Sequence, residues 1–334
     1  MNGSEWSALV DTTFYPPQDL SKLALTEIMY NPPARGTNSG DEFEFVELKN
    51  TGTTILDLSG LNFNGIGFTF TNGTKLAPGA FFVLVHNAAS FALKYPGVVI
   101  NGVFAGRLDN GGETLRLVHP VGTTVFTVSY DDEAPWPVAA DNYDFSLVQS
   151  GLTQAPDREG NWRASALPGG SPGADDPPPN VARVVINEVL SASVPPLLDE
   201  VELFNPGSQA ADVSGWFVTD DLNQPNRFRI PDGTQIPPGD YISFDETRLG
   251  FGLNSHGEQI YLLSANTNGA LTGYSHGFSF GAASDNVSFG RYMNSVGDEQ
   301  FPAQMSRSFR AANSGPRVGP IVGRTLNTPL CWLT

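Results

Sequence analysis

Hydrophobic residues occur along most of the chain in short runs that are separated by turn-forming residues. The runs are rich in Phe, Val, Ile, Leu and Thr, which favour strands. Asn72-Gly73, Asn110-Gly111 and Asp232-Gly233 mark tight turns, because glycine accepts the positive φ that such turns require. Only "NAASFALKYP" (87–96) is typical of a helix, which Pro96 would end. The pattern therefore predicts an all-β chain built from two-sheet antiparallel sandwiches.

The same pattern of strands and turns occurs twice. "VELKNTGTTILDLSGL" (46–61) matches "VELFNPGSQAADVSGW" (201–216) at a constant offset of 155 residues. Two further pairs of segments follow in the same order, 68–84 with 227–244 and 108–117 with 253–262. Because chance does not preserve both residues and order, we expect two units that share one fold.

A proline-rich segment separates the two copies. "GGSPGADDPPPN" (169–180) has no hydrophobic periodicity, and its consecutive prolines favour an extended, stiff spacer. The first residues read as the end of a preceding β-module, whereas the last residues resemble no further domain. The predicted organisation is an upstream segment 1–22, a first sandwich 23–175, a linker 176–183, a second sandwich 184–318 and a tail 319–334.

The amino-acid composition argues against several classes of binding partner and of stabilising site. The formal net charge of -17 argues against a basic face that binds nucleic acid. The single cysteine, Cys331, excludes an internal disulfide and a cysteine-rich zinc site. No apolar run reaches the roughly 18 residues of a membrane helix, so we expect no membrane insertion. No signal peptide is visible, which fits either a cytosolic protein or an internal piece of a longer exported chain.

Several segments together resemble the lamin-tail domain, in two copies. They are the opening strands "LTEIMYNP" (25–32) and "VINEVLSA" (185–192), the "VEL" strand followed by Asn and "SG", the "GGETL" strand (111–115), and the closing "NWRAS" with "GGSPG". The resemblance is closest to bacterial members, which occur in tandem in large exported proteins. It implies immunoglobulin-like β-sandwiches, an extracellular or cell-surface location, and a role in binding or attachment rather than catalysis.

Two repeated glutamates lie on apolar strand faces. By strand alternation Glu27 shares a face with leucines, and Glu188 shares one with Val184 and Ile186. A buried carboxylate needs a cation or a proton. We therefore expect structural ion pairs of Glu27 with Arg163 and of Glu188 with Arg310. The alternative is that each strand ends before its glutamate, which then reaches solvent.

A second repeated pair, Glu47 and Glu202, is expected to face outward from half-exposed strands. There these acids would be ordinary surface groups, or would contribute to a binding surface together with Trp136. Tryptophans in glycan-binding modules stack on sugar rings, and Trp216 is a second candidate platform. The alternative for both tryptophans is packing inside the sandwich.

Acidic turns offer oxygen ligands for calcium. Asp141, Asp144 and Asp285 are the candidate ligands, and Asp141-Asn142 matches Asp285-Asn286 between the copies. None of these turns has the spacing of a dedicated calcium loop, so solvated turns are the alternative. The four histidines show no ligand spacing, which argues against zinc.

No catalytic motif is present. The chain lacks the Gly-x-Ser-x-Gly and Ser-x-x-Lys nucleophile patterns, and acids that repeat together with their flanking turns are better explained by the fold. We therefore expect no catalytic residue, no cofactor other than calcium, and a partner that is protein or polysaccharide. Two alternatives remain open, namely a calcium-dependent adhesive module and an accessory domain pair attached to a hydrolase or a kinase-like enzyme. The oligomeric state is not fixed by the sequence.

Overall fold

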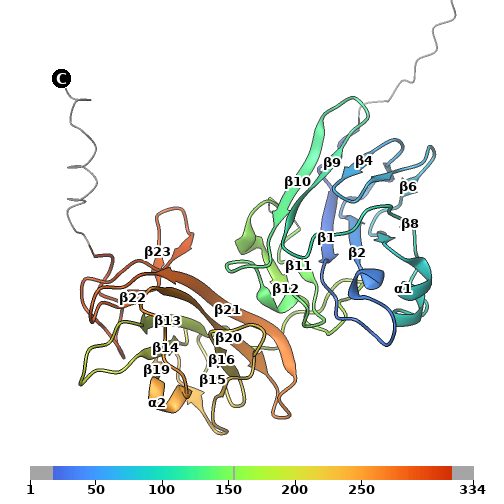
Figure 1. Ribbon diagram of the computed structural model, residues 1–334. Helices are drawn as coiled ribbons and strands as arrows, with labels where there is room; N and C mark the ends of the chain where they lie inside the picture. Colours follow the sequence, from blue (N-terminus) through green and yellow to red (C-terminus); the bar gives the residue numbers. More distant parts are fainter. Residues whose placement is uncertain (1–17, 153–154, 318–334) are drawn as a thin grey trace, which may run out of the picture. The chain divides into compact units, whose positions relative to one another are not determined.

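The computed structural model describes residues 18–152 and 155–317 (Figure 1). The predicted tail 319–334, and the predicted upstream segment 1–22 apart from residues 18–22, lie outside these residues. Strands account for 36% of the described residues and helices for 7%. The prediction of an all-β chain is therefore confirmed.

The chain divides into two compact units. The first holds the residues up to Tyr130 together with Gln149–Asn161 and Pro172–Asp175. The second holds Asp131–Val148, Trp162–Ser171 and the residues from Asp176 onward. The boundaries expected from the sequence, 23–175 and 184–318, stay a prediction.

The first unit is built around the central strand β2 (Phe45–Asn50). It pairs antiparallel with β1 (Leu23–Met29) on one side and with β7 (Phe81–Val85) on the other, and β7 pairs in parallel with β8 (Gly102–Val103). A second sheet has the order β10-β9-β4-β5, with β10 at Thr124–Tyr130, β9 at Glu113–Val118, β4 at Asn62–Asn64 and β5 at Phe68–Thr69. The two sheets pack through aromatic rings, for Phe70 lies against Phe82 with ring centroids 5.1 Å apart.

Short elements complete the first unit. Strand β3 (Leu56–Asp57) pairs with β6 (Lys75–Leu76). Helix α1 (Ala88–Lys94) forms within the segment predicted to be helical, because the side chain of Asn87 accepts hydrogen bonds from the N–H groups of Ala89 and Ser90. The 3-10 turns η1 (Gly40–Phe43) and η3 (Glu159–Asn161) also belong to the first unit. The turn η2 (Val138–Ala140) and strand β12 (Trp162–Ala164) fall in the second unit, and strand β11 (Leu147–Gln149), which neighbours β12, spans the division between the units.

The second unit repeats this arrangement. Its central strand β14 (Glu200–Phe204) lies between β13 (Val185–Leu190) and β19 (Tyr241–Asp245), and β22 (Phe289–Gly290) flanks β13. The other sheet has the order β17-β16-β20-β21, with β17 at Phe228–Arg229, β16 at Phe217–Thr219, β20 at Gly257–Ala265 and β21 at Leu271–Gly281. Its short elements are β15 (Ala211–Asp212), β18 (Gln235–Ile236), α2 (Glu246–Leu249), β23 (Tyr292–Met293) and β24 (Glu299–Gln300).

The core of the second unit lies between its two sheets. Val189 and Val201 from the first sheet belong to the same buried cluster as Val218 and Ile260 from the second. Each such side chain stabilises the unit by about 1.5–3 kcal/mol through removal from water. This packing confirms the predicted two-sheet sandwich, and it explains why most strands of the unit are apolar on the inward face.

Candidate functional site

The repeated glutamates of the first unit lie opposite each other across two paired strands. Glu27 on β1 is the register partner of Glu47 on β2, and a β-bulge at Thr26 interrupts the ladder beside them. Each glutamate is 1% exposed. The Glu47 carboxyl accepts hydrogen bonds at Oε1 from the Thr26 hydroxyl (2.7 Å) and at Oε2 from the N–H of Gly173 (2.5 Å).

The second unit builds the same pair from matching positions. Glu188 on β13 is the register partner of Glu202 on β14, with the bulge at Asn187. The Asn187 amide donates to Glu202 Oε1 (2.8 Å), and the main-chain N–H of Arg310 donates to Glu202 Oε2. Gly173 and Arg310 both have a positive φ, of 86° and 65°. In each unit, then, the second glutamate of the pair accepts a hydrogen bond from a residue with left-handed backbone conformation. This residue, Gly173 or Arg310, lies in what we call the closing segment of its unit.

The expected pair of Glu188 with Arg310 is wrong in its partner. Glu188 is buried, but it accepts hydrogen bonds from the hydroxyls of Ser288 (2.6 Å) and Ser308 (2.8 Å) and from the N–H of Ser308 (2.9 Å). Hydrogen-bond donors therefore stabilise this carboxylate without a cation. Arg310 contributes its main chain to Glu202, and Arg310 corresponds to Gly173 rather than to Arg163 in the first unit.

Arg163 also differs from the sequence expectation. Its guanidinium forms an ion pair with Asp176 (2.5 Å), whose side chain is almost fully buried, and donates to the carbonyl of Pro177. Asp176 additionally accepts a hydrogen bond from the N–H of Ala166. The arginine is thus bound to the start of the proline-rich segment, and its expected pairing with Glu27 stays a prediction.

Glu47, Glu202 and Trp136 do not form an exposed binding surface, so that prediction is also wrong. Both glutamates are buried, and Trp136 is 9% exposed and lies against Trp162 with ring centroids 6.0 Å apart. The physical reason is that β2 and β14 are central strands whose outer faces are covered by the closing segments. Trp216 likewise lies in the core of the second unit, where it packs rather than stacks on a ligand.

Burial sets the protonation of the second glutamate in each pair. It raises the pKa of Glu47 to about 8, with a further contribution from the charge of Glu27. It raises the pKa of Glu202 to about 7, with a further contribution from Glu188. Two adjacent carboxyls in a low-dielectric site hold a proton near neutral pH, because ionising both is costly. Neither carboxyl is among the residues that line the pocket described below.

The predicted calcium ligands do not gather into a metal site. Among residues 18–152 and 155–317, no group of three or more histidine, cysteine, aspartate or glutamate side chains could hold a metal ion. Asn142 and Asn286, at matching positions, both have φ of 60°, so the neighbouring aspartates belong to two equivalent left-handed turns. Calcium binding by Asp141, Asp144 and Asp285 stays a prediction.

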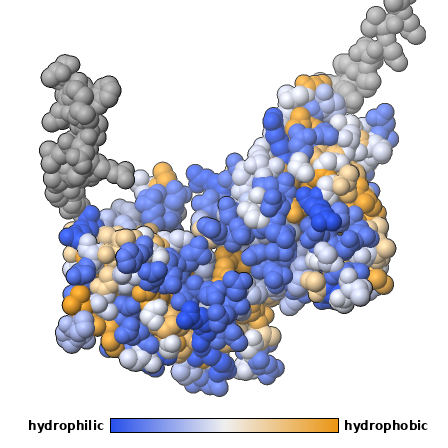
Figure 2. Space-filling model, in the orientation of Figure 1, coloured by the Kyte–Doolittle hydropathy of each residue, from blue (hydrophilic) through white to orange (hydrophobic). Residues whose placement is uncertain are grey.

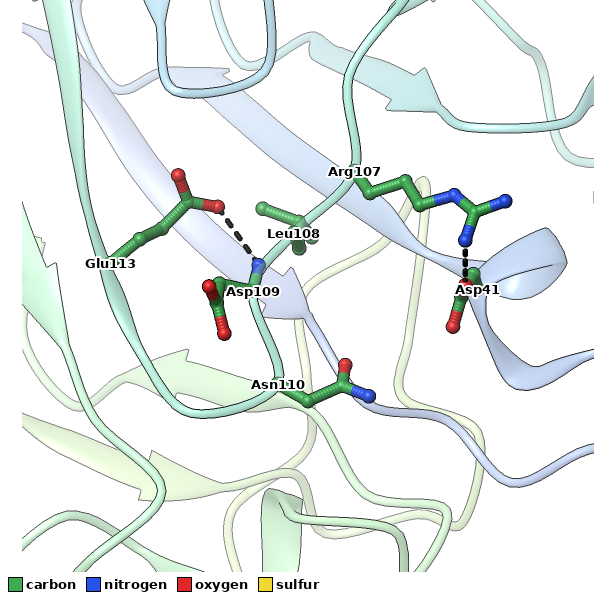
Figure 3. A pocket seen from close by; sticks show the side chains of 6 residues that line it. All are labelled: Asp41, Arg107, Leu108, Asp109, Asn110 and Glu113. Atoms are coloured by element: carbon green, nitrogen blue, oxygen red, sulfur yellow. Dashed lines mark hydrogen bonds and ion pairs between the residues drawn. The ribbon is translucent and has the colours of Figure 1, made fainter.

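A polar pocket of about 420 Å³ lies in the first unit (Figure 3). Its lining comes from η1, from the loop before β9 and from the first residue of β9, namely Asp41, Arg107, Leu108, Asp109, Asn110 and Glu113. Arg107 forms an ion pair with Asp41 (2.6 Å), and the N–H of Asp109 donates to Glu113 Oε1 (3.1 Å). The loop also accepts a hydrogen bond from the buried side of the sandwich, since the Tyr130 hydroxyl donates to the carbonyl of Asp109.

Glu44, directly before β2, is hydrogen-bonded to Leu108, one of the residues that line this pocket. Its Oε2 accepts a hydrogen bond from the N–H of Leu108 (2.9 Å), while its Oε1 has no hydrogen-bond partner among the described residues. Burial raises the pKa of Glu44 to about 8. The sequence interpretation missed this residue, although the acid at the matching position, Asp199, was a usable signal.

Asp199 shows why the two loops differ. It accepts hydrogen bonds from the N–H of Leu253 (2.8 Å), which matches Leu108, and from the N–H of Ser193 (3.2 Å). The residue of the first unit at the position of Ser193 is Pro32, which has no N–H. The buried acid is therefore fully bonded in the second unit and half bonded in the first.

Within residues 18–152 and 155–317, neither α1 nor α2 is long and apolar enough to cross a bilayer. Figure 2 shows that hydrophilic residues cover most of the visible face, with apolar residues in small groups between them. The exposed apolar side chains of the first unit include Leu93, Val99 and Val103.

Comparison with known proteins identifies the repeat. The family model of the Lamin Tail Domain matches residues 16–132 and again residues 177–277. No curated protein and no solved structure matches the chain. The two matches cover more than half of the sequence and coincide with the two copies found in it. The chain therefore belongs to the lamin tail domain family and contains two tandem immunoglobulin-like copies of that domain.

Proposed function

We propose that this chain is a non-catalytic interaction and spacer module of a larger secreted or cell-surface protein. In this role its two rigid β-sandwiches present loops to a partner that is a protein or a polysaccharide. The bacterial origin of such a parent protein is part of the same proposal.

The observation that carries this proposal is the matching internal use of the repeated glutamates. In both units the second glutamate of the pair accepts one hydrogen bond from the bulge residue and one from the closing segment. Residues that are duplicated together with their partners serve the fold. We therefore assign partner binding to the loops, which differ between the two copies.

The loop pocket of the first unit is the preferred contact region. It presents Arg107 and Asn110 at the surface, and it differs from the matching loop of the second unit, where Gly252 and Ser255 occupy these positions. An acidic pocket with one arginine suits a ligand that offers several hydroxyl or amide groups, because such groups both donate and accept hydrogen bonds.

The test is a binding assay on the full chain, immobilised and exposed to a panel of polysaccharides and purified surface proteins. Arg107→Ala is expected to weaken retention of the bound partner several-fold. Arg229→Ala is the matched control, since Arg229 is also a surface arginine in an ion pair with an aspartate. An equal loss of partner retention in the two variants would show that the pocket is not the contact region. Chemical conversion of any polysaccharide or protein of the panel would contradict the non-catalytic role.

A further inference from the structure

Lys49 and Asp175 are in contact on the outer face of the first unit. Lys49 lies on β2, two residues after Glu47, so both side chains are on the same face of the strand. Its Nζ contacts Oδ1 of Asp175 and lies 4.7 Å from the centre of the Phe81 ring. The Lys49 side chain is 14% exposed and that of Asp175 is 70% exposed.

The fold holds Asp175 in this place through the neighbouring residues of its own segment. Gly173 donates its N–H to the buried Glu47, which fixes the segment 172–175 across β2. Asp175 then follows two residues later and meets Lys49, which follows Glu47 by two residues. Lys49 and Asp175 are 126 residues apart in sequence, so only the tertiary fold brings them together.

The second unit has the same framework without these two groups. Phe204 occupies the position of Lys49 and stacks on Tyr241, with ring centroids 4.7 Å apart. Tyr241 corresponds to Phe81, and Ala312 follows Arg310 by two residues as Asp175 follows Gly173. The sandwich therefore does not need a lysine and an aspartate at these positions, and their presence in the first unit requires a separate explanation.

We propose that Lys49 and Asp175 condense to an intramolecular isopeptide bond that joins β2 to the closing segment of the first unit. The Nζ–Cγ bond forms and one Cγ–O bond of the aspartate breaks. The lysine ammonium gives up two protons, the departing oxygen takes up both, and one water leaves. The positive and the negative charge disappear together, so the net charge of the chain does not change, and no oxidant or other co-reactant is needed.

Three features of the site favour this reaction. The two reacting groups are held in contact, and such positioning replaces a bimolecular encounter by an intramolecular step with a large effective concentration. The exposed side of Asp175 gives the released water a path to solvent. Glu47 supplies a nearby carboxyl that is protonated around neutral pH and whose pKa responds to the charge of Asp175, so it can exchange protons with the pair.

An intact mass measurement on the purified full chain tests the proposal. The expected mass is that of the sequence minus one water, and fragmentation is expected to yield a branched peptide joining the segments around Lys49 and Asp175. Lys49→Arg keeps a cation over Phe81 but offers no amine, so it is expected to show the full sequence mass. A full sequence mass for the unaltered chain would overturn the proposal and leave an ordinary ion pair.

A second comparison tests the part assigned to Glu47. Glu47→Gln is expected to slow formation of the bond, as shown by a mixture of the two masses in freshly purified protein that shifts with time. Glu202→Gln is the matched change in the second unit. It is expected to have no effect on the bond, so all of the protein still shows the mass lower by one water. If Glu47→Gln gives full and immediate loss of water as well, the glutamate is not a proton-exchanging group of this site. If an unfolded variant prevents this measurement, the Lys49→Arg mass still decides the main proposal.

Discussion

The outer faces of the two central strands differ more than their inner faces do. In both units the strand carries the second glutamate of a buried pair, held by a bulge residue and by a left-handed residue of the closing segment. Two residues further on, the first unit has Lys49 in contact with Asp175, whereas the second has Phe204 stacked on Tyr241. The buried carboxyl pair is therefore shared by both units, whereas the residues next to it on the outer face differ between them.

The acid that precedes each central strand is likewise present in both units, while its surroundings differ. Glu44 and Asp199 both accept a hydrogen bond from the loop before the next long strand. Ser193 provides a second donor in one unit and Pro32 removes it in the other. Where Ser193 offers an N–H, Pro32 offers a ring, and one carboxyl oxygen of Glu44 is left without a hydrogen bond among the described residues.

The largest effect is expected from removal of the first glutamate of the second pair. Glu188→Ala leaves the donors of the buried Ser288 and the partly buried Ser308 without their acceptor, at a cost of about 4 kcal/mol in the free energy of unfolding of that unit. Denaturant unfolding of the full chain measures this cost. The matched Glu27→Ala is expected to act in the same direction on the first unit, and insensitivity of one unit would break the structural equivalence of the pairs.

The next effect is a loss of stability with rising pH. The folded pKa of Glu47 and of Glu202 lies above the ordinary value of 4.5, so the folded state keeps a proton that the unfolded state has released. This contribution is fully present below about pH 4.5 and is lost as pH rises, at about 1.4 kcal/mol per pH unit for each group. The loss is expected to end near pH 7 in the second unit and near pH 8 in the first.

Urea unfolding at a series of pH values between 5 and 9 measures this dependence. Glu47→Gln and Glu202→Gln each remove one titrating group, so each is expected to flatten the curve of its own unit only. The prediction would be contradicted if the free energy of unfolding rose between pH 5 and 7 in the unaltered chain and in both glutamine variants. The buried glutamates would then not control the pH dependence of stability.

A smaller effect separates Glu44 from Asp199. Asp199→Asn replaces an acceptor of two N–H groups by a side chain that accepts at one atom only, at a cost of about 2 kcal/mol. Glu44→Gln resembles the protonated acid that burial favours near neutral pH, so the expected cost is below about 1 kcal/mol. Equal costs for the two variants, measured by thermal and denaturant unfolding at pH 7, would remove the distinction between the loops.

The smallest effect is expected from calcium. Since Asp141, Asp144 and Asp285 do not form a group of metal ligands among the described residues, added calcium or a chelator is expected to leave the Tm of both units unchanged. Differential scanning calorimetry checks this outcome. A rise in Tm with calcium that Asp285→Ala abolishes would instead support the calcium-dependent adhesive module.

Much of the fold was predictable because it depends on local sequence signals. The Asn-Gly and Asp-Gly turns, the helix at 87–96 and the repeat of the "VEL" strand each follow from neighbouring residues, and they lead to two sandwiches of one family. The glutamates at 27 and 188 were also recognisable as buried acids, since they share strand faces with apolar residues.

The partners of these acids were not predictable in the same way. Strand alternation assigns a side chain to a face, but it does not say which distant segment covers that face. Glu47 is buried because the segment 172–175 crosses it, and Arg310 resembles Arg163 in its flanking letters while it corresponds in space to Gly173.

The sequence by itself determined that this chain is a duplicated all-β protein with a repeated acid on its second strand, because strand propensity, turn chemistry and repetition are local properties. Tertiary structure decided whether each acid is exposed, what donates to it and which pKa it has. Those outcomes depend on contacts between residues more than a hundred positions apart, such as Glu188 with Ser308, and on the low dielectric that such contacts create.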